Sequence, residues 1–177
     1  IGGSNIAIGE SAMSGVTTLQ ADSNIGIGAS ALVGTSATSG DCNVAIGTLA
    51  MTGLTTGANN IAIGTNAADA LLTSSNAIAI GQNALGAATA GLENIAIGYA
   101  AMAGVTTGQA DGNVAIGVSA LTGAASTTGN DNIALGTAAM DALTTGACNI
   151  AMGKNALGAA TTGTQNIAIG DRAISDG

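Results

Sequence analysis

The sequence predicts an all-β protein, a parallel β-solenoid or β-roll of about ten coils with 17 or 19 residues each. The first observation behind this prediction is a five-residue motif, Asn-Ile-Ala-Ile-Gly, that recurs along the whole chain. The second is the alternation inside the motif, which has the two-residue period of a β-strand. The third is the composition, because 29 Gly, no Pro and 1% aromatic residues suit one small cross-section repeated many times.

The motif opens with asparagine in nine copies and with alanine in the fifth. The copies begin at Asn5, Asn24, Asn43, Asn60, Ala77, Asn94, Asn113, Asn132, Asn149 and Asn166. The series of spacings restarts after five coils, and 14 of the 19 residues in 5–23 recur in 94–112. We therefore interpret residues 1–177 as a single repeat array with super-repeats at 5–93 and 94–177, and as a segment of a longer fibre.

Each coil is predicted to contain two short strands separated by turns. Ile-Ala-Ile forms the first strand, with Ile6 and Ile8 on one face and Asn5, Ala7 and Gly9 on the other. The closing glycine permits a sharp turn. The Ala-Leu or Ala-Met segment that follows is predicted to form the second strand, and a Thr-Thr-Gly-like stretch leads into the next coil.

Stacking the coils in register predicts two structural ladders. The asparagines form a polar column in which side-chain amides bond along the stack, at Asn5, Asn24, Asn43, Asn60, Asn94, Asn113, Asn132, Asn149 and Asn166. The last strand residues form an apolar column at Ile8, Ile27, Ile46, Ile63, Ile80, Ile97 and Ile116, continued by Leu135, Met152 and Ile169. Full burial would contribute very roughly 1.5–3 kcal/mol per side chain in that column. The Ala-rich second face is expected to contact another chain.

Four acidic residues precede strands in the 19-residue coils: Asp22, Asp41, Asp111 and Asp131. Carboxylates on adjacent coils are ligands that Ca²⁺ accepts, so these four residues are candidate Ca²⁺ ligands. Solvated loop acids that keep the rod soluble explain them equally well. No other cofactor is expected.

Two cysteines, Cys42 and Cys148, occupy the same place in coils that lie six apart. Stacking separates them by about 29 Å, which excludes a disulfide within the chain. They are interpreted either as small buried residues or as partners in bonds between chains.

Paired threonines recur at Thr17-Thr18, Thr55-Thr56, Thr106-Thr107, Thr127-Thr128, Thr144-Thr145 and Thr161-Thr162. A regular threonine array on a flat solenoid face would suit an ice-binding β-solenoid. Neighbouring strand residues point to opposite faces, however, so only part of each pair can join one array.

The composition argues against several other functions. The chain has no histidine for proton transfer and no Cys-x-x-Cys pair, so we do not expect an enzyme. A net charge of −8 repels nucleic-acid phosphates, and no long uncharged apolar run predicts insertion into a membrane.

The repeat Asn-x-Ala-x-Gly-x-x-Ala-Leu/Met, followed by Thr-Thr-Gly, resembles the repeats of phage and phage-like tail fibres, and is similar in pattern to the head repeats of trimeric autotransporter adhesins. The resemblance covers residues 5–174. It implies an intertwined or side-by-side homotrimer that forms the shaft of an extracellular fibre on a virion or cell surface. A host receptor would then be bound through a tip outside this segment. The alternatives are a cell-surface adhesin and a self-assembling extracellular filament.

Overall fold

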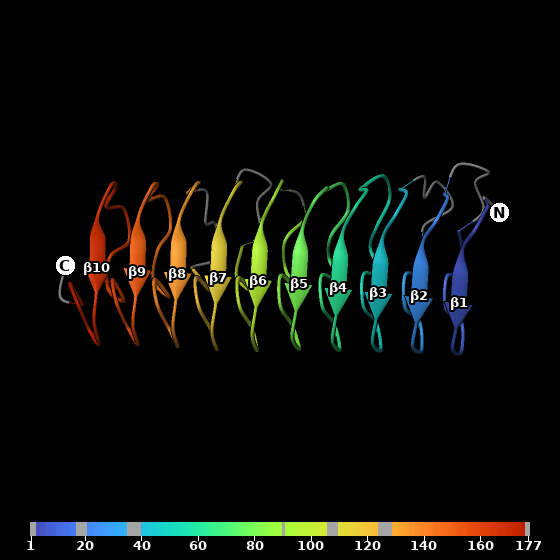
Figure 1. Cartoon of the computed structure of the whole chain (residues 1–177), viewed down its shortest axis with the longest axis horizontal. Coiled ribbons are helices and arrows are strands. Elements are labelled where there is room, and N and C mark those ends of the chain that lie inside the picture. The colour runs from blue at the N-terminus through green and yellow to red at the C-terminus, as the bar shows by residue number, and fades with distance from the viewer. Residues whose placement is uncertain are drawn as a thin grey trace.

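A computed structural model of the chain describes residues 3–16, 21–34, 40–89, 91–105, 110–123 and 129–175. Over these ranges the chain is a β-solenoid, in which ten strands lie side by side in sequence order and form one sheet (Figure 1). The strands are β1 (Ile6–Ile8), β2 (Ile25–Ile27), β3 (Val44–Ile46), β4 (Ile61–Ile63), β5 (Ile78–Ile80), β6 (Ile95–Ile97), β7 (Val114–Ile116), β8 (Ile133–Leu135), β9 (Ile150–Met152) and β10 (Ile167–Ile169). With strands about 4.8 Å apart, the rod is roughly 45 Å long.

All neighbouring strands are parallel and pair like residue with like. Ile25 of β2 pairs with Val44 of β3, for example, and Ile27 pairs with Ile46. The predicted all-β solenoid of stacked coils is therefore confirmed. No helix that could cross a membrane occurs in the described part of the chain.

The prediction of two strands per coil is wrong, because the Ala-Leu or Ala-Met segment is a turn. It still bonds from coil to coil, as Met51 N–H does to the carbonyl oxygen of Ala67 at 2.9 Å. Left-handed residues interrupt it: in the third coil Leu49 has φ 57° and Met51 has φ 55°. Such residues reverse the backbone direction and cannot belong to an extended strand.

The closing glycines limit each strand to three residues. Gly47 has φ +136°, and a Cβ atom added there would lie 2.5 Å from the carbonyl oxygen of Gly64 in the next coil. Only glycine meets both requirements, since it adopts this φ freely and lets two backbones approach closely.

The core is a set of small columns inside the coil. From β2 to β10 the middle strand residue is enclosed, as Ala45 and Ala62 show at 0% exposure, and so are the alanines that begin the turns of the second to ninth coils. Leu32, Met51 and Leu85, each at most 1% exposed, fill the remaining width. The interior accepts alanine from the strand because the coil is too narrow for a second layer of large side chains.

The asparagine column lies inside the coil beside this core. Asn43 is 0% exposed, and its amide group donates to Asn24 Oδ1 at 3.1 Å and to the carbonyl oxygen of Gly57 at 3.0 Å. Its own Oδ1 accepts hydrogen bonds from the main-chain and side-chain amides of Asn60, at 2.9 and 3.0 Å. Each asparagine therefore links its own coil to the coils on both sides.

Ala77 interrupts the column, and Ser74 occupies part of the freed space. Positions 57 and 60 are the equivalents of 74 and 77 in the preceding coil, and a Cβ atom built on Gly57 would lie 3.0 Å from the amide nitrogen of Asn60. By the same geometry, the Ser74 side chain faces the volume that an asparagine side chain at position 77 would occupy. The Ser74 hydroxyl is buried and has no hydrogen-bond partner among the described residues. The larger residue at 74 thus compensates for the smaller one at 77.

We expect the double substitution Ser74→Ala and Ala77→Asn to stabilise the chain by about 1–2 kcal/mol, because it completes the column and removes the unpaired hydroxyl. Ala110 lies three residues before Asn113, as residue 74 lies three residues before residue 77, so alanine at position 74 is compatible with an asparagine side chain at position 77. Chemical denaturation of the two single variants and the double variant measures this. The gain should exceed the sum of the single effects. A double variant no more stable than the parent would contradict it.

Candidate interaction surface

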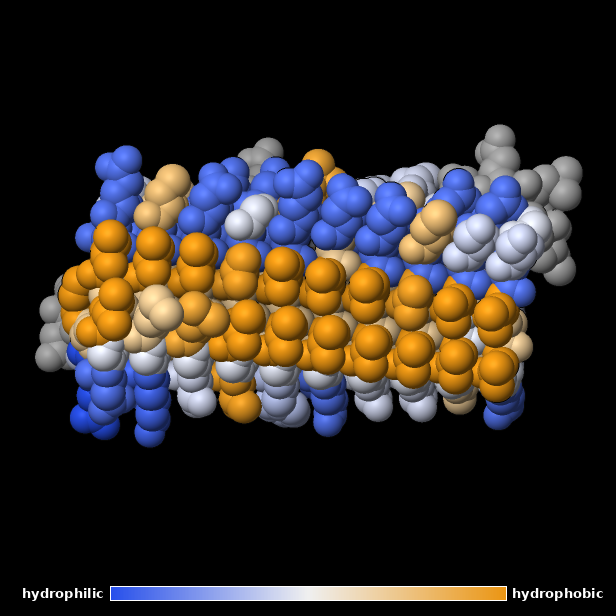
Figure 2. Space-filling model, viewed as in Figure 1, coloured by the Kyte–Doolittle hydropathy of each residue, from blue (hydrophilic) through white to orange (hydrophobic). Residues whose placement is uncertain are grey.

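The outer side of the sheet presents two continuous rows of aliphatic side chains, which Figure 2 shows along the length of the rod. We call this the apolar face and define it as the first and third residues of every strand. Its members are Ile6, Ile8, Ile25, Ile27, Val44, Ile46, Ile61, Ile63, Ile78, Ile80, Ile95, Ile97, Val114, Ile116, Ile133, Leu135, Ile150, Met152, Ile167 and Ile169. The apolar face contains no charged or polar side chain.

None of these side chains is buried in the single chain. Ile63 and Ile116, near the middle of the rod, are 36% and 37% exposed, and Ile8 is 58% exposed. Two rows over ten strands cover an area of about 450 Å². That equals the largest apolar patch of a typical monomeric protein, about 300–600 Å², and such patches are often functional.

The single chain therefore does not bury the Ile8 column fully. The expectation that the alanine side would contact another chain is wrong, because alanines such as Ala31 and Ala50 are enclosed within the coil. The alternation correctly placed Ile6 and Ile8 on one side and Ala7 on the other, but alternation does not say which side is inside. The narrow coil encloses alanine and turns the isoleucines outward. For the same reason, the sequence pattern did not identify the row that begins at Ile6 as part of a functional surface.

Cys42 and Cys148 lie beside the apolar face, two residues before the strands that begin at Val44 and Ile150. Both are exposed free cysteines, so their interpretation as small buried residues is wrong. Both have φ 58°, and the left-handed conformation turns the side chain away from the enclosed asparagine that follows. Bonding of these thiols between chains remains a prediction.

Three of the four Ca²⁺ candidates join neighbouring coils directly. Asp22 accepts a hydrogen bond from the Gly3 main-chain N–H, and its own N–H donates to Asp41 Oδ1 at 2.8 Å. Asp111 Oδ1 accepts from the main-chain N–H of Leu92 at 2.7 Å. The carboxylates thus satisfy backbone donors that the strands leave unpaired.

Asp131 lies one residue further along its coil and is exposed. Its neighbour Asn130 takes the linking place instead and accepts from Asp111 N–H at 2.9 Å. Within the described ranges no three His, Cys, Asp or Glu side chains gather as a metal site would require. Ca²⁺ binding by these residues remains a prediction.

The paired threonines that the structure describes also serve the stack. Thr55 Oγ1 donates to the carbonyl oxygen of Leu72, and Thr144 Oγ1 donates to that of Thr161, both at 2.7 Å. The pairs Thr17-Thr18, Thr106-Thr107 and Thr127-Thr128 lie outside the described residues. At Thr55 and Thr144 the hydroxyl proton is therefore directed into the rod rather than toward solvent.

Asp69 is a partly buried carboxylate on the turn that follows β4. Its Oδ1 atom is buried and unpaired, and burial raises the pKa of the carboxyl above its ordinary value of 3.8. A raised pKa in the folded chain means that ionisation opposes folding, so stability falls as pH rises through the interval above 3.8. The ionised Asp69 carboxylate thus lowers the stability of the folded chain at neutral pH.

We expect Asp69→Asn to raise the melting temperature at neutral pH, because the neutral amide avoids the desolvation of a charge. Below the ordinary pKa of aspartate the variant and parent should melt together. The control is Asp141→Asn, since Asp141 has the same place in its coil but is exposed. Thermal melts across this pH range measure the difference. An equal shift in both variants, or no shift in either, would contradict the assignment.

No protein-family model matches this chain, and neither the curated proteins nor the solved structures contain a significant match.

Proposed function

We propose that this chain is the structural shaft of an extracellular fibre, in which three copies run parallel and pack through their apolar faces. The observation that carries the proposal is the apolar face itself, with two uninterrupted rows of aliphatic side chains along the rod. Burying those rows between copies would remove a continuous apolar surface from water.

The physical properties of the coil suit a spacer. Consecutive coils are joined by main-chain bonds, such as Ile25 N–H to the carbonyl oxygen of Asn43 at 2.8 Å, and by the buried asparagine column. Each coil contacts only its neighbours, so length is added by repetition without disturbing the cross-section. Such a rod separates an anchor from a distant binding tip.

The threefold number and the biological setting come from the resemblance of the repeats. A phage tail fibre that mediates host attachment fits that resemblance best, and a cell-surface adhesin or a self-assembling filament would use the same shaft. Ice binding is less favoured, because the flat face of the rod carries isoleucine where a threonine array would be needed.

The decisive measurement is the mass of the chain in solution by light scattering or sedimentation. We expect a discrete species of three times the 16.4 kDa chain mass. A species of twice that mass would overturn the threefold arrangement. A clean monomer would overturn the shaft itself and favour a function of the single chain.

A further inference from the structure

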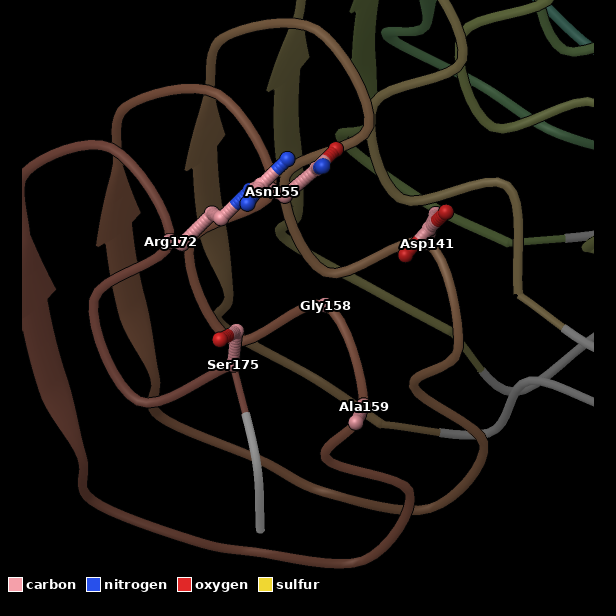
Figure 3. Close-up of a pocket in the computed structure, with 6 residues that line it drawn as sticks. All are labelled: Asp141, Asn155, Gly158, Ala159, Arg172 and Ser175. Carbon is pink, nitrogen blue, oxygen red and sulfur yellow. The ribbon is translucent and has the colours of Figure 1, made fainter.

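A hollow of about 400 Å³ lies on the turns that follow β8, β9 and β10. Asp141, Asn155, Gly158, Ala159, Arg172 and Ser175 line it. Figure 3 shows the side chains of Asn155 and Arg172 close together, with Asp141 across from them on a neighbouring coil. None of the lining residues belongs to the apolar face, so packing of copies through that face leaves the hollow accessible.

The hollow arises from a difference in side-chain size along one column. Asp141, Gly158 and Ser175 have the same place in three successive coils. Gly158 has no side chain, and a Cβ atom there would lie 3.5 Å from Asp141 Oδ1. Asp141 and Ser175 therefore form opposite walls two coils apart, about 9.6 Å between backbones. The volume of about 400 Å³ leaves room for a small organic ligand beside these walls.

The hollow is lined by one cation and one carboxylate, Arg172 and Asp141. The chain has ten acidic residues and only two basic ones, Lys154 and Arg172. Both bases lie on the last two coils, whose sequences also contain Asp171 and Asp176, so recognition of an anionic group there depends on the Arg172 side chain and not on the overall charge. The guanidinium group offers paired donors that match a carboxylate, while the Asp141 carboxylate accepts hydrogen bonds from hydroxyl groups.

We propose that this hollow binds a saccharide unit that carries a carboxylate. Arg172 holds the sugar carboxylate, and the exposed carboxylate of Asp141 accepts from ring hydroxyls on the opposite side. The amide of Asn155 lies between them and can both donate and accept, as the mixed edges of a sugar require. Binding at this place makes the shaft a contact surface in its own right, independent of any tip and of the number of chains in the fibre.

The same arrangement of an aspartate, an asparagine and a glycine on neighbouring coils occurs once more without an arginine. Asp69, Asn83 and Gly86 have the places of Asp141, Asn155 and Gly158, and Asp69 Oδ1 lies 3.4 Å from a Cβ atom built on Gly86. The next coil, however, has Ala100 and Ala103 where Arg172 and Ser175 occur. The chain thus contains a related arrangement that lacks Arg172 and Ser175 and in which the aspartate, Asp69, is more buried than Asp141.

The experiment titrates the full chain with D-galacturonate and with its neutral counterpart D-galactose, followed by calorimetry and ligand-observed NMR. We expect galacturonate to bind at one site per chain and galactose to bind at least about tenfold more weakly. Arg172→Gln should weaken galacturonate binding by about the same factor. Lys154→Gln removes an equal charge outside the hollow and should change the affinity less than about twofold. Equal losses in both variants would reduce the effect to general electrostatic attraction and overturn the proposal.

A gain-of-function variant provides the independent check. Ala100→Arg with Ala103→Ser places the missing groups beside Asn83 and Gly86, on a backbone of the same conformation, since Ala100 and Arg172 both have φ 54°. We expect the number of galacturonate sites per chain to rise from one to two. An unchanged number, with the circular dichroism spectrum of the parent retained, would contradict the proposed role of Arg172. Equal binding of the two sugars would exclude a carboxylate as the recognised group.

Discussion

Replacing Ile63 by aspartate is expected to convert the proposed assembly into monomers while the coil itself stays folded. Ile63 lies on the apolar face near the middle of the rod and is 36% exposed in the single chain. In a packed assembly the new carboxylate would lose water without gaining a partner, which costs several kcal/mol for each copy. Mass measurements by light scattering should fall to the 16.4 kDa of one chain.

The matched control is Leu72→Asp. Leu72 is 40% exposed, nearly the same as Ile63, but it lies on a turn outside the apolar face. This variant should keep the mass of the parent, and circular dichroism should show the same β-structure for both variants. An Ile63→Asp chain that remains associated would locate the contact between copies elsewhere. Dissociation of both variants would mean that the rod tolerates no added charge.

Replacing Asn132 by alanine is expected to cause the largest loss of stability in a single coil, about 3 kcal/mol or more. Asn132 is fully buried, and its amide nitrogen donates to Asn113 Oδ1 at 3.1 Å and to the carbonyl oxygen of Gly146 at 2.9 Å. Its Oδ1 accepts two hydrogen bonds from Asn149, both at 3.0 Å. Alanine would leave several of these groups buried and unpaired at once.

Urea denaturation measures this loss against Asn59→Ala. Asn59 is exposed and has a left-handed φ of 59°, so its replacement should cost about 1 kcal/mol, well below the loss at Asn132. The comparison separates the contribution of the buried asparagine column to stability from the general effect of replacing an asparagine. Similar costs for the two variants would show that the column contributes little beyond the main-chain bonds. A loss confined to neighbouring coils, seen by hydrogen exchange, would fit a structure in which each coil contacts only the next.

Much of the fold could be predicted because repetition removes most of the choices. Asn5 and its counterparts recur at 17 or 19 residues, and only stacking in register places such residues together. The parallel sheet, the strand at Ile-Ala-Ile and the facing of Asn43 toward Asn60 follow from that one observation. The hollow beside Arg172 was not predicted, because it depends on Gly158, which lies between two walls, Asp141 and Ser175, on coils that are two apart.

The remaining errors concern local backbone conformation. Leu49, Met51 and Cys42 adopt left-handed φ values that L-residues seldom take, and sequence patterns carry little signal for them. They convert the expected second strand into a turn and hold the cysteines at the surface. Neither outcome follows from hydropathy, because the same alternation is compatible with a strand on either side of the coil.

The sequence by itself determined the period, the register and the identity of every column, since like residues must stack when coils of nearly constant length repeat. Only the tertiary structure decided which columns are inside. The coil closes so tightly that alanine and asparagine fill it beside one leucine or methionine, and the strand isoleucines must point outward. The physical reason is the small cross-section of a 17- or 19-residue coil, which makes the most hydrophobic side chains of the strands a surface rather than a core.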